Sequence, residues 1–198
     1  FGSGIAVNTF GASDDVWKQA VISQLDKIQH TSNLYYNENG AKLAKMLCTK
    51  TGMKKVFFSN SGAEANECAI KAARKYGTDK NADKNIIITL ENSFHGRTIT
   101  TLSATGQDVF HKNFTPFTDG FIHTPANDIE KLNSSISDKV TAIMIEIVQG
   151  EGGVNTLSSE FLAEIERITT EKDILLIIDE VQTGNGRCGK LYSYMNFD

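Results

Sequence analysis

Apolar residues recur along the chain with two spacings that predict alternating helices and strands. Steps of three and four residues, typical of a helix with one buried face, predict helices over residues 14–29 and 40–49, and a further helix that Ser158 or Ser159 caps and that runs to about residue 172. A run rich in Ala and other helix formers predicts a helix over residues 63–76. Short unbroken apolar runs predict strands at residues 56–58, 85–90, 140–145 and 174–178. This alternation favours an α/β fold in which flanking helices cover a mainly parallel sheet.

The strand predicted at residues 174–178 ends at a carboxylate. Its five consecutive apolar residues are typical of a strand that is buried on both faces. Asp179 follows directly, at the end of the strand where open α/β sheets bind ligands. Because a buried carboxylate is costly unless a cationic group meets it, the sequence predicts a cationic partner for Asp179.

A turn and a helix start after residues 56–58 form a candidate anion site. Asn60-Ser61-Gly62 is a turn sequence, and the next helix is predicted to begin at Ala63. The unpaired N–H groups and the positive end of such a helix attract anions, and glycine lets the backbone approach them closely. Phosphate is the candidate ligand, and an ordinary turn that binds nothing is the alternative.

Two further segments follow predicted strands and carry chemically active side chains. In residues 93–98, Phe94 could stack on a flat ligand and Arg97 could grip a carboxylate. The alternative is a core phenylalanine beside a solvated arginine. Residues 146–153 combine Glu146 and a second carboxylate with three glycines, which indicates either a site or a tight connection.

Composition excludes several classes of function. The chain has 198 residues, 40% hydrophobic and 22% charged, with a net charge of −4 and no basic cluster for nucleic acid. No apolar run approaches the ~20 residues that span a bilayer. The four histidines are scattered, so no metal site is predicted, and three widely spaced cysteines fit reduced thiols in the cytoplasm.

A nucleotide-hydrolysing P-loop is the main alternative that the residues raise. Leu175–Glu180 resembles a Walker B strand, and Gly184–Lys190 nearly completes a Walker A loop. Leu191, however, replaces the Ser or Thr that would hold Mg²⁺, no strand directly precedes the glycines, and the two elements occur in reverse order. These departures disfavour a nucleotidase.

Four motifs in one order resemble the class III pyridoxal-phosphate (PLP) aminotransferases. They are NSGAEANE at 60–67, SFHGRT at 93–98, QGEGG at 149–153 and DEVQTG at 179–184. The resemblance implies the large domain of an aspartate aminotransferase-like PLP-dependent transferase.

Further segments narrow the resemblance within the family. Residues 3–8, 30–37 and 186–191 are similar to members that transfer an amino group between N-acetylornithine and 2-oxoglutarate in arginine biosynthesis. Members acting on succinylornithine, ornithine or 4-aminobutyrate are alternatives, as is a non-catalytic α/β remnant. The departures are Ala12–Asp15, where the family usually reads His-x-His-Pro, and Ile147, which replaces a common proline.

The resemblance also implies roles for single residues. It implies that Asp179 pairs with the pyridinium nitrogen of PLP. That nitrogen would be the cationic partner predicted above for Asp179. Phe94 would stack on the pyridine ring, and Gln182 would lie near the phenolic oxygen. The implied cofactor-binding set is Ser61, Gly62, Ala63, Phe94, Asp179, Val181 and Gln182.

Substrate contacts are implied for Arg97 and Glu146. In related enzymes the glutamate pairs with a substrate-binding arginine that lies further along the chain. Such a pair would let one pocket take both the amino donor and 2-oxoglutarate.

The resemblance further implies that these 198 residues are an incomplete copy of the enzyme. The family's Schiff-base lysine lies beyond Asp198, so we expect the chain alone to be inactive; its start, without an initiator Met, is also expected to be cut. Residues 1–30 would be the end of an N-terminal segment, and 31–198 the large PLP-binding domain, truncated before the lysine and the C-terminal small domain. The parent enzyme is expected to be a homodimer.

Overall fold

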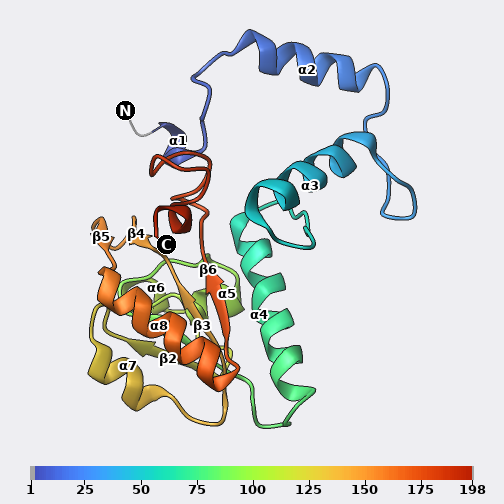
Figure 1. The fold of residues 1–198 in the computed structure, drawn as a ribbon. Helices are drawn as coiled ribbons and strands as arrows, with labels where there is room; N and C mark the ends of the chain where they lie inside the picture. Colours follow the sequence, from blue (N-terminus) through green and yellow to red (C-terminus); the bar gives the residue numbers. More distant parts are fainter. Residues whose placement is uncertain (1–2, 198) are drawn as a thin grey trace. The chain divides into compact units, whose positions relative to one another are not determined.

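The computed structural model describes residues 3–197. These residues form two compact units, which divide between Phe58 and Ser59. The first unit consists of helices and loops, and the second contains the sheet (Figure 1). The predicted domain boundary at residue 30 stays a prediction.

The first unit holds α1 (Ser3–Ala6), α2 (Asp15–Leu25) and α3 (Glu38–Thr51). Asp14 caps α2 by accepting a hydrogen bond from Trp17 N at 2.7 Å, and Gly52 ends α3 in the left-handed conformation that glycine favours. Helix α2 stops four residues before its predicted end. No residue between 3 and 58 is buried, so the apolar stripe of α2 is exposed within this unit.

The strand predicted at residues 56–58 does not form. This segment belongs to no helix or sheet within the described chain, and Phe57 and Phe58 are exposed. A short apolar run predicts an extended backbone, whereas a strand also requires a neighbour to pair with. That neighbour is not encoded locally, and the prediction was wrong.

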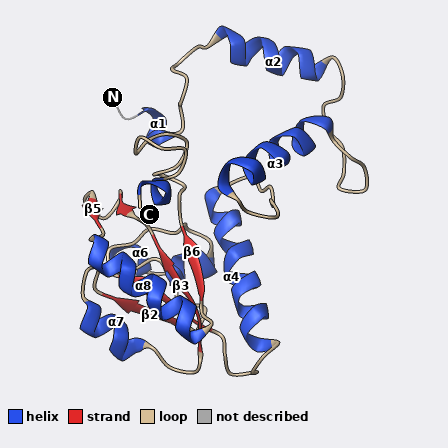
Figure 2. Ribbon diagram, in the orientation of Figure 1, coloured by secondary structure: helices blue, strands red, loops and turns tan. Residues whose placement is uncertain are grey.

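The second unit is built on a parallel sheet of four strands. These are β1 (Ile86–Leu90), β2 (Phe121–Thr124), β3 (Val140–Ile145) and β6 (Leu175–Ile178), in the order β2-β1-β3-β6. A small antiparallel hairpin, β4 (Val148–Gln149) and β5 (Asn155–Thr156), follows β3 (Figure 2). The mainly parallel sheet is as predicted, although β2 was not foreseen.

Helices cover both faces of this sheet (Figure 1). Those in the second unit are α4 (Gly62–Thr78), α5 (Ile99–Ala104), α6 (Asp108–His111), α7 (Ile129–Ser135), α8 (Ser159–Lys172) and the 3-10 helix η1 (Ser193–Asn196). None of the helices in residues 3–197 is long and apolar enough to cross a membrane.

Alternate residues of each strand enter two separate apolar clusters. Ile88 and Ile143 pack toward Phe161 of α8, whereas Ile87 and Met144 join the cluster that contains Ile70 of α4. This alternation is expected of strands sandwiched between two helical layers.

Strand β6 departs from its predicted environment. It pairs with β3 and lies at the edge of the sheet among the described strands, and Leu176 is 41% exposed. The prediction that both of its faces are buried was therefore wrong, because position within a sheet depends on chain topology and not on the apolar run itself.

Helix α4 runs through Gly77, which was predicted to end it. Gly77 is buried, and a Cβ there would lie 2.0 Å from the carbonyl oxygen of Lys84. The glycine therefore permits a close backbone approach instead of terminating the helix.

Candidate active site

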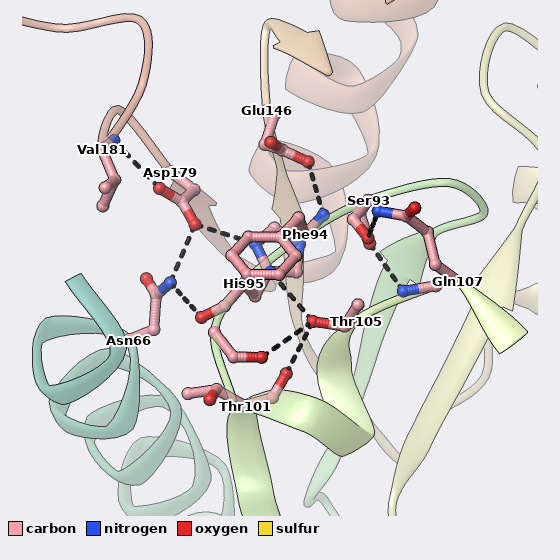
Figure 3. A network of polar contacts seen from close by, with 12 residues as sticks. Asn66, Ser93, Phe94, His95, Thr101, Thr105, Gln107, Glu146, Asp179 and Val181 are labelled. Carbon is pink, nitrogen blue, oxygen red and sulfur yellow. Dashed lines mark hydrogen bonds and ion pairs between the residues drawn. The ribbon is translucent and has the colours of Figure 1, made fainter. Parts of the chain in front are cut away.

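Three loops leave the carboxyl ends of β1, β3 and β6 on the same edge of the sheet. They begin at Glu91, Glu146 and Asp179. Because the strands are parallel, the loops converge, and α4 begins beside them (Figure 3).

Asp179 is the best-connected buried acid in this cluster. Its Oδ2 atom lies 2.9 Å from Nδ1 of His95 and accepts a hydrogen bond of 2.8 Å from the amide of Asn66. Its Oδ1 atom accepts a hydrogen bond of 3.0 Å from Val181 N (Figure 3). Burial by itself raises the pKa of Asp179, but the bond to His95, its charge and the other donors together leave that pKa below its usual value.

Hydrogen bonds tie the loop that carries His95 to residues 105–107. His95 N donates to Thr105 Oγ1 at 2.9 Å, Gly106 N donates to Ser93 Oγ at 3.0 Å, and the side chain of Gln107 donates to Ser93 O at 3.1 Å. His95 is 2% exposed, and its Nε2 atom has no hydrogen-bond partner within residues 3–197. The imidazole is therefore held rigidly against Asp179.

Two N–H groups at the N-terminus of α4 have no hydrogen-bond acceptor within residues 3–197. Ser61 caps the helix, because its Oγ accepts from Glu64 N at 3.2 Å while its carbonyl accepts from Ala65 N. Gly62 and Ala63 occupy the first two helical positions, whose N–H groups have no acceptor within the helix. The predicted anion site is thus available at this point of the fold.

Two glycines bring neighbouring segments into contact with this helix start. A Cβ on Gly62 would lie 2.6 Å from a methyl carbon of Val181, and a Cβ on Gly96 would lie 2.9 Å from that of Ala63. Gly96 also has φ of +128°, a conformation that other residues rarely adopt. The loops after β1 and β6 therefore both contact the first turn of α4.

Glu146 is a second buried acid in the cluster. Its Oε2 atom accepts a hydrogen bond of 3.0 Å from Phe94 N. Burial, opposed by the charge of His95 and by the Phe94 N–H, raises the pKa of Glu146 to about 7. Asp179 and Glu146 thus have pKa values shifted in opposite directions, which is common in active sites.

The guanidinium of Arg97 packs against two aromatic rings. It lies 4.7 Å from the ring centre of Phe110 on α6 and 5.8 Å from that of Phe94. The two rings meet edge to face at 5.6 Å. Cation–π contact therefore restrains the exposed Arg97, which remains free to meet a carboxylate.

Gln182 contacts the glycine-rich turn between β4 and β5. Its Nε2 donates to Glu151 at 3.1 Å, and its Oε1 fills the space where a side chain of Gly150 would begin. The structure thus places the predicted residues either on loops at one edge of the sheet or at the start of α4, and it brings Val181 close to Gly62.

Sequence reasoning missed three residues of this cluster as site residues. Asn66 and His95 lie inside the quoted motifs, but motif spacing does not reveal that they meet Asp179. Phe110 lies outside every motif, and no local signal predicts its contact with Arg97. No group of three His, Cys, Asp or Glu side chains in residues 3–197 is arranged to hold a metal.

The structure does not support the P-loop alternative. Residues 184–190 are turns that follow β6 indirectly, and the next element in the chain is the short helix η1. A P-loop requires the glycines to join a strand directly to an α-helix.

Comparison with known proteins connects this geometry to one family. The family model for class-III aminotransferases matches residues 1–198 of this chain. The acetylornithine aminotransferase of Haemophilus ducreyi is 54% identical over 200 residues, which span all of this chain and 51% of the relative. The succinylornithine transaminase of Yersinia enterocolitica is 45% identical over 204 residues, covering 100% of this chain and 49% of its own length.

A solved structure shows the same fold. The ornithine aminotransferase of Toxoplasma gondii, with partial occupancy of PLP at its active site, is 31% identical and superposes with a TM-score of 0.92 over 98% of this chain and 47% of that one. The chain spans about half the length of the curated relatives that it matches. Because the family model matches residues 1–198, the chain belongs to the class-III aminotransferases.

Proposed function

We propose that the protein carrying this chain is a PLP-dependent transaminase that moves an amino group between N-acetylornithine and 2-oxoglutarate. The observation that carries this proposal is Asp179, a buried acid with a lowered pKa beside the N-terminus of α4. An ionised acid suits a cationic ring nitrogen, and the helix N-terminus suits a phosphate, so the residues fit both charged ends of PLP.

Each predicted residue has a part in this proposal. Ser61, Gly62 and Ala63 would hold the phosphate, while Phe94, Val181 and Gln182 would hold the ring. Asp179 would keep a proton on the ring nitrogen. When bound, PLP supplies an electron sink for the electrons released as the substrate Cα–H bond breaks.

Arg97 and Glu146 act on the substrate side. Arg97 offers a restrained guanidinium for a substrate carboxylate. Glu146, with its pKa near neutrality, changes charge readily and can therefore accommodate substrates of different charge.

N-acetylornithine is the favoured amino donor because the relative with 54% identity bears that name. Succinylornithine is the second candidate, supported by the relative with 45% identity. Both donors are acylated on the α-nitrogen and keep the δ-amino group free for transfer, so the ratio of the kcat/KM values for the two donors distinguishes the two assignments.

We propose a homodimer in the cytoplasm as the working form. The apolar residues Val16, Trp17 and Ile22 of α2 are 80%, 57% and 50% exposed, which supports a partner that covers them. Cys48, Cys68 and Cys188 are free thiols, as is usual in a reducing compartment. Light scattering tests the dimer, because a monomer at micromolar concentration would contradict it.

The decisive experiment is a titration with PLP of the purified protein and its Asp179→Asn variant. Asparagine keeps the shape of the side chain but removes the charge, and we expect the Kd for PLP to rise at least about tenfold. The exposed Asp138→Asn variant is the control. Equal PLP affinity in all three proteins, or binding of Mg-ATP instead of PLP, would overturn the assignment.

A further inference from the structure

The side-chain amide of Asn66 joins three separate segments of the chain. Its Nδ2 atom donates to Asp179 Oδ2 and to the carbonyl oxygen of His95, both at 2.8 Å (Figure 3). Asn66 lies on α4, His95 on the loop after β1, and Asp179 on the loop after β6. One amide group therefore links the helix to both loops.

The position of Asn66 is unusual for a polar residue. It lies on the buried face of α4 with Ile70 and Ala73, and it is 6% exposed. Asparagine is a poor helix former, and a buried amide is costly unless it is hydrogen-bonded. Both available protons of its amide nitrogen are used, so the cost is offset by two specific bonds.

These bonds fix the carboxylate of Asp179 in space. Asn66 and His95 hold Oδ2, and the backbone of Val181 holds Oδ1. Three donors from three segments leave the carboxylate plane little freedom to rotate. Asn66 is the donor that comes from α4 itself, one helical turn after Gly62.

We propose that Asn66 is a positioning residue that orients the Asp179 carboxylate and sets its spacing from the first turn of α4. A fixed spacing would serve two charged ends of one ligand: a phosphate at Gly62 and Ala63, and a ring nitrogen at Asp179. This inference rests on the proposed function for the identity of that ligand, which is PLP.

A measurement on the protein without cofactor tests the link between Asn66 and Asp179 directly. Asn66→Leu keeps the approximate volume of the side chain but deletes the amide donor. We expect the Asp179 pKa, followed by ¹³C NMR of its carboxyl carbon, to rise, because a hydrogen bond to the ionised form has been lost. The other charged groups near Asp179, His95 and Glu146, are unchanged in the variant.

Asn133 on α7 provides a matched control. Its amide also donates to a carbonyl, that of Ile129 at 3.0 Å, and to a carboxylate, that of Glu164 at 2.7 Å. Asn133→Leu should leave the Asp179 pKa at its wild-type value. An Asp179 pKa that is the same in Asn66→Leu and the wild type would overturn the proposed link.

The affinity for PLP supplies a second readout. Asn66→Leu should raise the Kd for PLP about tenfold at every pH, the loss of one buried hydrogen bond to a charged group. Asn66→Asp is expected to behave differently, because two adjacent carboxyl groups share one proton and the protonated form can again donate. Its Kd relative to wild type should therefore fall toward one as the pH is lowered from about 9 to about 6.

The outcomes separate the two proposals. A Kd ratio for Asn66→Asp that is independent of pH, or equal to that of Asn133→Asp, contradicts the positioning role even if Asn66→Leu fails to fold. If the wild-type protein does not bind PLP, the proposed function fails, while the Asp179 pKa in the cofactor-free variants still decides whether Asn66 orients the acid.

Discussion

The imidazole of His95 and the carboxylate of Asp179 meet at 2.9 Å in the buried centre of the site, although 84 residues separate them in the chain. The side chains of the pair are 0% and 4% exposed. Removing one partner of a buried charged contact is expensive, because the other partner is left without compensation.

His95→Leu is therefore expected to lower the free energy of unfolding by about 3 kcal/mol. His95→Asn, which can place an amide donor near the position of Nδ1, should recover much of this loss. Urea unfolding of the cofactor-free proteins at neutral pH measures both effects. If the two variants were equally unstable, packing and not the contact with Asp179 would explain the cost.

Glu146 should make stability depend on pH near neutrality. Its pKa is raised from 4.5 to about 7. Its favourable contribution to the free energy of unfolding is therefore complete below pH 4.5 and is lost as the pH rises through about 7. Glu146→Gln removes this dependence on pH. Relative to wild type, its free energy of unfolding should increase by about 3 kcal/mol as the pH rises from 4.5 to 8. Urea unfolding across this range is the measurement, with the exposed Glu130→Gln as control, and parallel profiles for wild type and Glu146→Gln would contradict the burial argument.

Gly96 is expected to tolerate no side chain. Gly96→Ala combines a positive φ with contacts of 2.6 Å to Thr101 Oγ1 and 2.9 Å to Ala63 Cβ, and should lose about 3 kcal/mol of stability. Gly186→Ala has a similar φ of +88° but open space around it, and should lose only about 1 kcal/mol. Thermal unfolding of both variants measures the part of the stability loss that the close contacts cause. Equal losses of stability in the two variants would contradict a cost from those contacts.

Ser61 and Ser158 cap two helices in the same way. Each accepts a hydrogen bond of 3.2 Å from the residue three positions later, so Ser61→Ala and Ser158→Ala should each lose about 1 kcal/mol of stability. Only Ser61→Ala loosens the proposed phosphate site, and its Kd for PLP should rise about fivefold. Calorimetry with PLP distinguishes the two variants, and weakened binding in Ser158→Ala would point to a global effect instead.

Phe110 restrains Arg97 through the contact at 4.7 Å. If Arg97 meets the substrate carboxylate, Phe110→Leu should raise KM for N-acetylornithine about threefold with little change in kcat. Phe121→Leu removes a comparable contact, 5.0 Å from Arg74, and is the matched control. Steady-state kinetics of the protein that carries this chain provide the test, and an unchanged KM would exclude this role for Phe110.

The sequence by itself determined the α/β class and most of the elements around the site. The strand over residues 140–145 is found at its predicted bounds, and α8 begins after Ser158, one of its two predicted caps, because apolar runs and cap residues act locally. The turn before α4 was also predicted, with the helix start one residue late at Ala63, because turn residues act on neighbours in the chain. The cap by Ser61 was not predicted.

Only the tertiary structure decided which distant groups meet. The chain pattern does not reveal that Asn66 and His95 converge on Asp179, that Phe110 contacts Arg97, or that residues 56–58 lack a strand partner. Each of these depends on how parallel strands align and on where loops return. Those relations follow from packing across the whole sheet, whereas sequence spacing encodes only the contacts within one element.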